Sequence, residues 1–256
     1  MSNRSDKSSK RDVIILGAGK GTRMGGELPK VLTEVAGSPM IVHVMREVEK
    51  AGFNPPVVVV GYKADMVKDS LPKHSRFALQ TEQKGTGHAV KITQDMALQD
   101  DGSILILYGD QPLVKADTLL SIFDAHEKHE HPLTIATITV DSFDGWQSPF
   151  STNGRIVRDA DGKVLSIIEK KDATPEQLQI KEVNPAYFCV DASWLWKSLE
   201  KINTNNAQGE YYLTDIVGIA FQEGHPIMTV SIPPEEALGV NTPEQRDIAE
   251  RMFGNK

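Results

Sequence analysis

The chain has 256 residues, a formal net charge of −7 and one cysteine, Cys189. This length fits one large α/β domain or two small ones, and the acidic balance argues against a nucleic-acid-binding surface, which would need clustered positive charge. A lone cysteine excludes an intrachain disulfide. Because Cys189 lies in an apolar run, we interpret it as a buried structural thiol rather than a nucleophile.

Residues 1–11 are polar and basic, and they lack the apolar segment that a signal peptide carries. We expect them to form a disordered tail ahead of a single domain over residues 12–256. No apolar run in the sequence approaches membrane-spanning length. We therefore expect a cytoplasmic protein, a monomer or weak oligomer, with no nucleic-acid or membrane partner.

A glycine-rich loop follows the first apolar run, residues 13–16, which predicts a buried strand. Glycines leave the backbone N–H groups open to a close approach by an anion. The loop and the residues after it contain three alternating glycines and three cations: Gly17, Gly19, Gly21, Lys20, Arg23 and Lys30. This combination predicts a phosphate-binding site at the end of the first strand.

Three interpretations of this loop compete. A Walker A loop needs Ser or Thr after Gly-Lys, but Gly21 follows the lysine here. A dinucleotide-binding fingerprint needs G-x-G-x-x-G, and Thr22 stands where its third glycine belongs. The loop does resemble the signature of nucleotidyltransferases that activate sugar phosphates, in which an arginine and then a Pro-Lys pair follow the glycines, here Arg23 and Lys30.

Apolar runs typical of strands alternate along the chain with segments whose apolar residues recur at helical spacing. In the first half, the predicted strands are 57–60, 77–79, 104–108 and 134–140, and the predicted helices are 39–51, 64–71, 86–97 and 116–129. This alternation predicts an α/β fold with a Rossmann-like, doubly wound, mixed but mostly parallel sheet.

The second half predicts a hairpin, in which strands 155–158 and 163–168 flank an Asp-Gly turn. Further strands are predicted at 187–190 and 227–231, and helices at 192–202, 211–223 and 243–253. No linker separates the two halves. We expect the second half to lie over the carboxyl ends of the strands, where open α/β sheets bind their ligands.

Asp110 directly follows the predicted strand 104–108. A carboxylate at the carboxyl end of a central strand can hold a hard cation such as Mg²⁺, which prefers oxygen ligands. The alternative is a capping role at the helix that starts near Ala116. Glu169, Asn184 and Asn241 stand in comparable positions but carry little information singly.

Gln80 and Gln83 stand just before a Gly85-Thr86 turn. An amide donates and accepts at once, which suits the edge of a uracil. The alternative is a purely structural glycine turn capped by Thr86. A second cluster, His126, His129 and His131, lies near a predicted helix end, where histidines are usually solvated. We favour solvation over a metal site there.

Several phrases, taken in order, carry a family resemblance: LGAGKGTRM, LPKVL, LQTEQKGTGHA, LYGDQPL, NGRIVRD, EKKDAT, NNAQGEYYLTDIV and GVNTPEQ. Together they resemble the uridylyltransferase half of the bacterial bifunctional N-acetylglucosamine-1-phosphate enzymes. The resemblance extends from about Val13 to Met252 and implies the nucleotide-diphospho-sugar transferase fold. It implies a nucleotide-binding half at about 12–115 and a sugar-binding half at about 116–242.

The resemblance also implies an activity, the transfer of the uridylyl group of UTP to N-acetylglucosamine 1-phosphate with release of pyrophosphate. Arg23 and Lys30 would be catalytic and hold the triphosphate, and Asp110 and Asn241 would bind Mg²⁺. The implied nucleotide-binding residues are Leu16, Gly17, Ala18, Gly19, Gln80, Gly85 and Thr86. The implied sugar-binding residues are Tyr108, Gly109, Gly154, Glu169 and Asn184.

The chemistry of this reaction fits the residues present. A sugar phosphate has a second pKa of about 6 and is already ionised at pH 7, so it can attack the α-phosphorus of UTP without a general base. Catalysis then consists of positioning and charge neutralisation. This explains why the sequence shows no candidate nucleophile or acid–base pair.

Three departures from the family leave parts of this interpretation open. The chain stops at Lys256 without a hexapeptide repeat, so we expect no acetyl transfer. Residues 145–156 replace a short family turn with an insertion that carries Trp146 and Phe150, either as a lid over the sugar or as anchors of a surface loop. The family's Asn-Thr-Gly is Asn184-Pro185-Ala186 here.

Because the last two departures lie on the sugar side, glucose 1-phosphate and N-acetylgalactosamine 1-phosphate stay open as substrates. So does a catalytically idle protein that binds sugar nucleotides. The intact set of Arg23, Lys30, Asp110 and Asn241 favours the enzyme, whose partners would be UTP and a sugar 1-phosphate.

Overall fold

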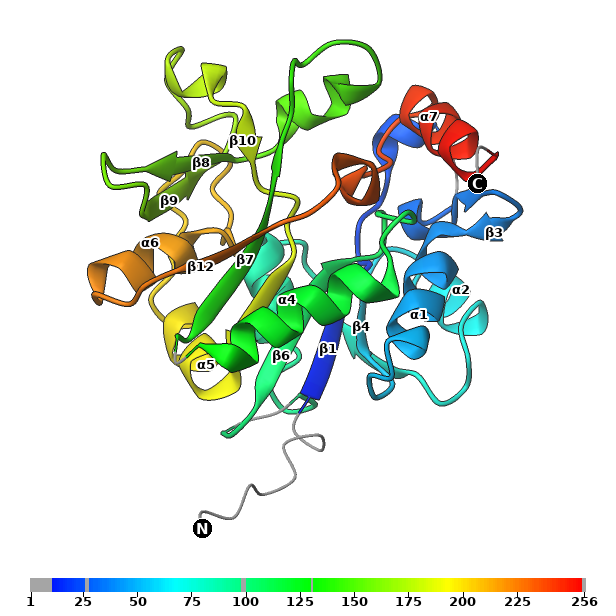
Figure 1. The fold of residues 1–256 in the computed structure, drawn as a ribbon. Helices are drawn as coiled ribbons and strands as arrows, with labels where there is room; N and C mark the ends of the chain where they lie inside the picture. Colours follow the sequence, from blue (N-terminus) through cyan, green and yellow to red (C-terminus); the bar gives the residue numbers. More distant parts are fainter. Residues whose placement is uncertain (1–10, 26–27, 98–99, 130, 255–256) are drawn as a thin grey trace.

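The computed structural model describes residues 11–25, 28–97, 100–129 and 131–254 (Figure 1). The tail expected at residues 1–11 lies outside the described residues except for Arg11. That residue opens the first strand, β1 (Arg11–Leu16). The first strand therefore begins one residue earlier than the domain boundary expected from the sequence.

Four parallel strands form the half of the sheet that carries the glycine-rich loop. They lie in the order β5 (Arg76–Leu79), β4 (Val57–Val60), β1 and β6 (Ser103–Tyr108). The β-branched run of β4 is buried throughout, as expected for a strand covered on both faces. Because the strands are parallel, their carboxyl ends meet at one edge of the sheet, where Leu16 pairs with Tyr108.

Beyond β6 the sheet becomes mixed. β11 (Phe188–Asp191) runs antiparallel between β6 and β7 (Leu133–Thr139), and β12 (Met228–Ser231) pairs with β7 in parallel. Since β11 is antiparallel to both neighbours, β7 points the same way as β6. The doubly wound, mixed and largely parallel sheet predicted from the sequence is confirmed, with β11 as its reversed strand.

A small antiparallel layer continues from the carboxyl end of β7 (Figure 1). β10 (Glu182–Val183) pairs with β7 and with β8 (Arg155–Arg158), which forms a hairpin with β9 (Val164–Ile168). The predicted hairpin is confirmed. This layer brings the second half of the chain to the edge where the strands of the first half end.

Helices cover both faces of the sheet (Figure 1). Buried residues of α1 (Met40–Lys50), α2 (Ala64–Asp69), α4 (Ala116–Lys128) and α7 (Pro243–Gly254) belong to one core cluster. Those of α3 (Thr86–Lys91), α5 (Ala192–Leu199) and α6 (Asp215–Gln222) belong to the other. Across the described part of the chain, no helix combines the length and apolar character needed to cross a membrane.

Several predicted helices are shorter than expected, α3 and α6 most of all, and the insertion is not a loop. α3 ends at Lys91. α6 begins only at Asp215, because residues ahead of it bind the turn between β5 and α3 through their backbone. The insertion forms a 3-10 helix, η4 (Gly145–Thr152). The remaining short elements are β2 (Glu34–Val35), β3 (Ser38–Pro39), η2 (Thr22–Met24), η3 (Lys30–Leu32), η5 (Gln177–Gln179) and η6 (Pro234–Ala237).

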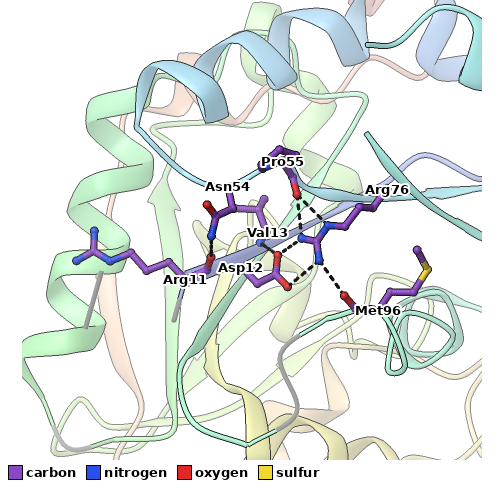
Figure 2. A network of polar contacts seen from close by, with 7 residues as sticks. All are labelled: Arg11, Asp12, Val13, Asn54, Pro55, Arg76 and Met96. Atoms are coloured by element: carbon purple, nitrogen blue, oxygen red, sulfur yellow. Dashed lines mark hydrogen bonds and ion pairs between the residues drawn. The ribbon is translucent and has the colours of Figure 1, made fainter. Parts of the chain in front are cut away.

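A polar cluster ties the amino-terminal edge of the parallel strands together (Figure 2). The guanidinium of Arg76 pairs with the buried carboxylate of Asp12 and donates to the carbonyls of Pro55 and Met96, both at 2.8 Å. Asp12 also accepts from the N–H of Val13 at 3.0 Å. One side chain thus fastens β1, β5, the segment before β4 and the turn after α3.

Candidate functional site

A cavity of about 710 Å³ opens at the carboxyl edge of the sheet. Both halves of the chain contribute to its walls. Nine of the residues expected at the site line it: Arg23, Lys30, Thr86, Tyr108, Asp110, Gly154, Glu169, Asn184 and Asn241. Seven others do not: Leu16, Gly17, Ala18, Gly19, Gln80, Gly85 and Gly109. The catalytic, metal and most sugar-side candidates therefore share one space, while most of the nucleotide candidates lie beside it.

Lys30, Asp110 and Asn241 meet although they are far apart in the chain. Lys30 opens η3, Asp110 follows β6, and Asn241 precedes α7. The Lys30 Nζ lies 2.5 Å from Asp110 Oδ2 and 2.8 Å from Asn241 Oδ1. Arg23 Nη2 donates to the same Asn241 oxygen at 3.3 Å. One carboxylate oxygen and one amide oxygen thus converge on a single cation, the ammonium of Lys30.

This donor set fits a magnesium ion. Mg²⁺ is commonly bound by one or two protein oxygens and completes its coordination with phosphate oxygens and water, and the ammonium shows that the two oxygens already converge on a cation. Within the described residues, no group of three or more His, Cys, Asp or Glu side chains could hold a metal ion. A metal at Asp110 and Asn241 would therefore rely on the substrate for further ligands.

Glycine residues make room for the Lys30 side chain. Gly21 adopts a φ of +69°, and a Cβ there would stand 2.7 Å from the Lys30 Cβ. A Cβ at Gly19 would stand 3.7 Å from the Lys30 Cε. The glycine-rich loop therefore wraps around the lysine stem, and any larger residue at position 21 would collide with it.

Two glycine N–H groups at the carboxyl ends of β1 and β6 form hydrogen bonds with neighbouring strands. The N–H of Gly17 donates to Val59 at 2.9 Å, and the N–H of Gly109 donates to Leu16 at 2.9 Å. These two N–H groups are therefore engaged in joining strands, and a nucleotide contact at these residues would need other atoms. A Cβ on Gly61 would stand 2.9 Å from both the Ala18 Cβ and the Gln83 Nε2, which places Gln83 beside the loop.

Gln80 braces the turn that follows β5. It is 3% exposed, and its Nε2 lies 3.2 Å from the carbonyl of Gly85 and 3.0 Å from His88 Nδ1. Burial lowers the pKa of His88, which favours the neutral ring that can accept this hydrogen bond. Both interpretations of Gln80 remain compatible with this geometry, but a structural role is visible.

The segment before α6 binds the same turn. Gly87 donates to the carbonyl of Tyr211 at 2.8 Å, and Leu213 donates to the hydroxyl of Thr86 at 3.0 Å. A Cβ on Gly85, whose φ is +110°, would stand 2.5 Å from the Tyr211 oxygen. Gly85 is therefore required by this close backbone contact. Thr86 does not cap α3 through its side chain, as the structural alternative expected, and its hydroxyl accepts from the segment before α6 instead.

Glu169, expected to bind the sugar, lines the cavity. Its Oε1 accepts from Thr214 Oγ1 at 3.1 Å and would lie 3.4 Å from a Cβ on Gly154. Burial raises the pKa of the Glu169 carboxyl. Burial also raises the pKa of the Tyr108 phenol, which bonds with Thr86. Burial thus disfavours the charged form of the Glu169 carboxyl at this wall of the cavity.

The turn at Asn184-Pro185-Ala186 is held by its own side chain. Asn184 Oδ1 accepts from the N–H of Ala186 at 2.8 Å. Ala186 adopts a φ of +69°, a left-handed conformation that favours glycine. The glycine of the family turn therefore has a structural reason, and Ala186 adopts the same region at a cost in strain.

The insertion contributes residues of η4 to the wall of the cavity. Phe150 is 1% exposed, borders the cavity and meets Trp146 edge-on, with ring centroids 6.1 Å apart. The buried Arg155 donates to the carbonyl of Ser151 at 3.2 Å and to that of Asn153. Burial lowers the pKa of Arg155. Trp146 packs against the core behind Phe150.

Several residues that border the cavity were not predicted from the sequence. Gln111 donates to the carbonyls of Pro185 at 2.7 Å and Ala237 at 3.1 Å, so it links the Asp110 segment to the sugar side. Lys171 donates to Gln208 at 2.8 Å, and Gln208 donates to the hydroxyl of Tyr212 at 2.8 Å. All four stand inside family-like phrases, but only the fold shows that they share one cavity.

The expected solvation of the histidine cluster is correct for the exposed His129 but wrong for His126, and His131 is half-buried. His126 is 2% exposed, not solvated, and its ring nitrogens lie 3.0 Å from Thr134 Oγ1 and 3.1 Å from Asp191 Oδ1. His129 and His131 stack with their ring centroids 6.0 Å apart. The correction has a simple cause: the inward face of α4 buries His126 against β7, where hydrogen bonds satisfy it. Cys189 is buried as expected, and burial raises its pKa.

Comparison with known proteins gives consistent results. Residues 13–208 match the family described as MobA-like NTP transferase domain. The chain is 44% identical over 230 residues to the bifunctional protein GlmU of Clostridium acetobutylicum, covering 90% of this chain and 49% of that protein. It is 43% identical over 232 residues to GlmU of Enterococcus faecalis, covering 90% and 49%. The chain thus spans about half the length of these relatives.

Solved structures with low sequence identity share the fold. A protein described as a glucose-1-phosphate thymidylyltransferase from Bacillus anthracis superimposes with a TM-score of 0.74 at 17% identity, covering 94% of each chain. HddC from Yersinia pseudotuberculosis, complexed with GMP-PN, superimposes with a TM-score of 0.64 at 20% identity, covering 94% of this chain and 99% of that one. The family resemblance and the fold expected from the sequence are confirmed.

Proposed function

Because the chain belongs to the family of MobA-like NTP transferase domains, we propose that it transfers the uridylyl group of UTP to N-acetylglucosamine 1-phosphate. The products would be UDP-N-acetylglucosamine and pyrophosphate. The observation that carries the proposal is the convergence of Lys30, Asp110, Asn241 and Arg23 at one side of a cavity whose other side carries Glu169. The similarity to GlmU proteins supports the choice of substrates.

In this reaction a phosphate oxygen of the sugar phosphate attacks the α-phosphorus of UTP. The bond between the α-phosphorus and its bridging oxygen breaks, and the electron pair leaves with pyrophosphate. Lys30 and Arg23 would bind the charged phosphate oxygens and stabilise the charge that grows on the leaving group. Asp110 and Asn241 would hold Mg²⁺, which supplies additional neutralisation of phosphate charge when bound.

The sugar side carries features that could select a different sugar. The wall formed by η4 and the Asn184-Pro185-Ala186 turn both border the cavity, and both depart from the family pattern. A transferase for glucose 1-phosphate or N-acetylgalactosamine 1-phosphate is therefore the second candidate. A sugar-nucleotide-binding protein without activity is the third, and the intact cation cluster argues against it.

Pyrophosphate release over a panel of substrates tests the proposal. The panel combines UTP, CTP, dTTP, ATP and GTP with the 1-phosphates of N-acetylglucosamine, N-acetylgalactosamine and glucose, with Asp110→Asn as the inactive control. We expect the highest kcat/KM for UTP with N-acetylglucosamine 1-phosphate. A higher kcat/KM for another nucleotide and sugar phosphate would identify that pair as the substrates instead. Nucleotide binding without any pyrophosphate release would support the inactive alternative.

A further inference from the structure

The ammonium of Lys30 stands between the two side chains proposed to hold the metal ion. Its Nζ lies 2.5 Å from Asp110 Oδ2 and 2.8 Å from Asn241 Oδ1. A magnesium ion would need the same oxygens at about 2.0–2.1 Å. Because both cations would bind the same carboxylate and the same amide oxygen, and would repel each other at this distance, Lys30 and a metal ion compete for the site.

We propose that Lys30 is the resident cation of this site in the nucleotide-free protein, so that a divalent cation binds tightly only when a nucleoside triphosphate draws Lys30 away. The inference rests on the proposed function, because it takes Asp110 and Asn241 as the metal ligands. It assigns Lys30 a second role in addition to phosphate binding. Metal and nucleotide binding become coupled, and each raises the affinity for the other.

Lys30 has the freedom that this role requires. Lysine carries a compact charge on a flexible stem, with three rotatable donors. The stem lies against Gly19 and Gly21, which present no side chains to block its movement. The Lys30 side chain is 20% exposed and borders the cavity, so its ammonium can exchange the Asp110 carboxylate for a phosphate oxygen.

The Asp110 carboxylate is buried enough to need a neighbouring cation whether or not a metal ion is bound. Its side chain is only 10% exposed, and a carboxylate that is mostly removed from water is costly without a partner. Arg23 does not fill this role, because its Nη2 donates to Asn241 at 3.3 Å and, among the described residues, makes no hydrogen bond to Asp110. Lys30 alone contacts both proposed ligands among the hydrogen bonds of the described residues.

The test measures Mn²⁺ binding to the nucleotide-free protein by electron paramagnetic resonance, independently of any activity. We expect wild type to bind Mn²⁺ weakly and Lys30→Met to bind it at least about tenfold more tightly, a coupling of ordinary size between two competing groups. Lys30→Gln is the second variant, in case Lys30→Met folds poorly. The gain should disappear when Asp110→Asn is added to either variant.

Lys128→Met is the matched control for charge. It removes one positive charge from the far end of α4, at the opposite edge of the sheet, and should leave Mn²⁺ affinity unchanged. Equal affinities of wild type, Lys30→Met and Lys30→Gln would overturn the proposal. So would an equal gain in Lys128→Met, or a gain that survives Asp110→Asn. An Asp110-dependent gain in a protein that releases no pyrophosphate would support the Lys30 role and reject only the proposed function.

Discussion

Two clusters of cations and carboxylates stand at opposite ends of the same parallel strands, and they are built differently. At the amino-terminal edge, the guanidinium of Arg76 binds Asp12 and two backbone carbonyls at once (Figure 2). At the carboxyl edge, the ammonium of Lys30 binds Asp110 and Asn241 beside an open cavity.

The difference follows from the two side chains. Arginine presents a planar fork of donors that is fixed once several acceptors meet it, whereas lysine is a point charge on a flexible stem. Arg76 is therefore suited to hold four chain segments together permanently. Lys30 is suited to a site where its ammonium exchanges the Asp110 carboxylate for a phosphate oxygen. An ion pair between a cation and an aspartate thus supports stability at one edge and the proposed uridylyl transfer at the other.

The largest expected effect is at the carboxyl edge. Asp110→Asn removes the one carboxylate of the proposed metal site and should lower kcat by roughly 10²–10³, the size of effect seen when one stabilising group is lost from an active site. The unfolding midpoint should change little, because the amide can still accept from Lys30. Steady-state pyrophosphate release and thermal unfolding measure both. Activity within a few-fold of wild type would remove Asp110 from the mechanism.

Lys30→Ala and Arg23→Ala should separate two kinds of phosphate contact. Each loses a charge-assisted contact of about 1.5–3 kcal/mol, so at least a tenfold loss in kcat/KM is expected. Arg23→Ala should act mainly on kcat, because pyrophosphate charge grows in the transition state, and Lys30→Ala on both kcat and KM. An Arg23→Ala enzyme that changed only the KM for UTP would contradict the leaving-group role.

The amino-terminal cluster should respond in the opposite manner. Asp12→Ala leaves the Arg76 guanidinium without its carboxylate and should lower the free energy of unfolding by about 1.5–3 kcal/mol, with kcat unchanged. Urea unfolding measures the loss, and Asp65→Ala, at an exposed carboxylate paired with Lys68, is the control. If Asp12→Ala lowered kcat while leaving stability intact, the two edges would not be separable as described.

The insertion tests whether the cavity wall is fixed. Trp146→Ala removes a half-buried ring behind Phe150 and should cost about 1 kcal/mol of stability from lost apolar burial, with the ranking of sugar phosphates unchanged. Phe150→Leu, at the cavity itself, is the paired variant and should change that ranking. A changed ranking in Trp146→Ala would instead support a lid over the sugar.

The last prediction concerns the pH dependence of stability. Burial and the neighbouring Asp172 raise the pKa of Asp215 from 3.8 to about 6. The folded protein holds this proton more tightly than the unfolded chain does. Protonated Asp215 therefore contributes fully to the free energy of unfolding below about pH 4, and this contribution is lost as the pH rises through 6. Asp215→Asn should therefore gain stability relative to wild type at pH 8 compared with pH 4. Urea unfolding of wild type and Asp215→Asn at both pH values measures this change. An equal difference in the free energy of unfolding at pH 4 and pH 8 would show that the pKa of Asp215 is not raised.

The sequence by itself determined the local features of the protein. The β-branched run of residues 57–60, the hairpin around the Asp-Gly turn and the glycine-rich loop depend on local propensities, and all three appear in the structure. Family-like phrases were sufficient to identify Lys30, Asp110 and Asn241 as candidates. None of these residues needed knowledge of its distant neighbours to be noticed.

Only the tertiary structure decided how these pieces meet. Lys30 contacts residues that stand 80 and 211 positions away, and no periodicity encodes such a meeting. The reversal of β11, the burial of His126 and the need for glycine at Gly85 likewise depend on packing between remote segments. Local sequence specifies which elements form, whereas contacts across the sheet edge specify which side chains share one cavity.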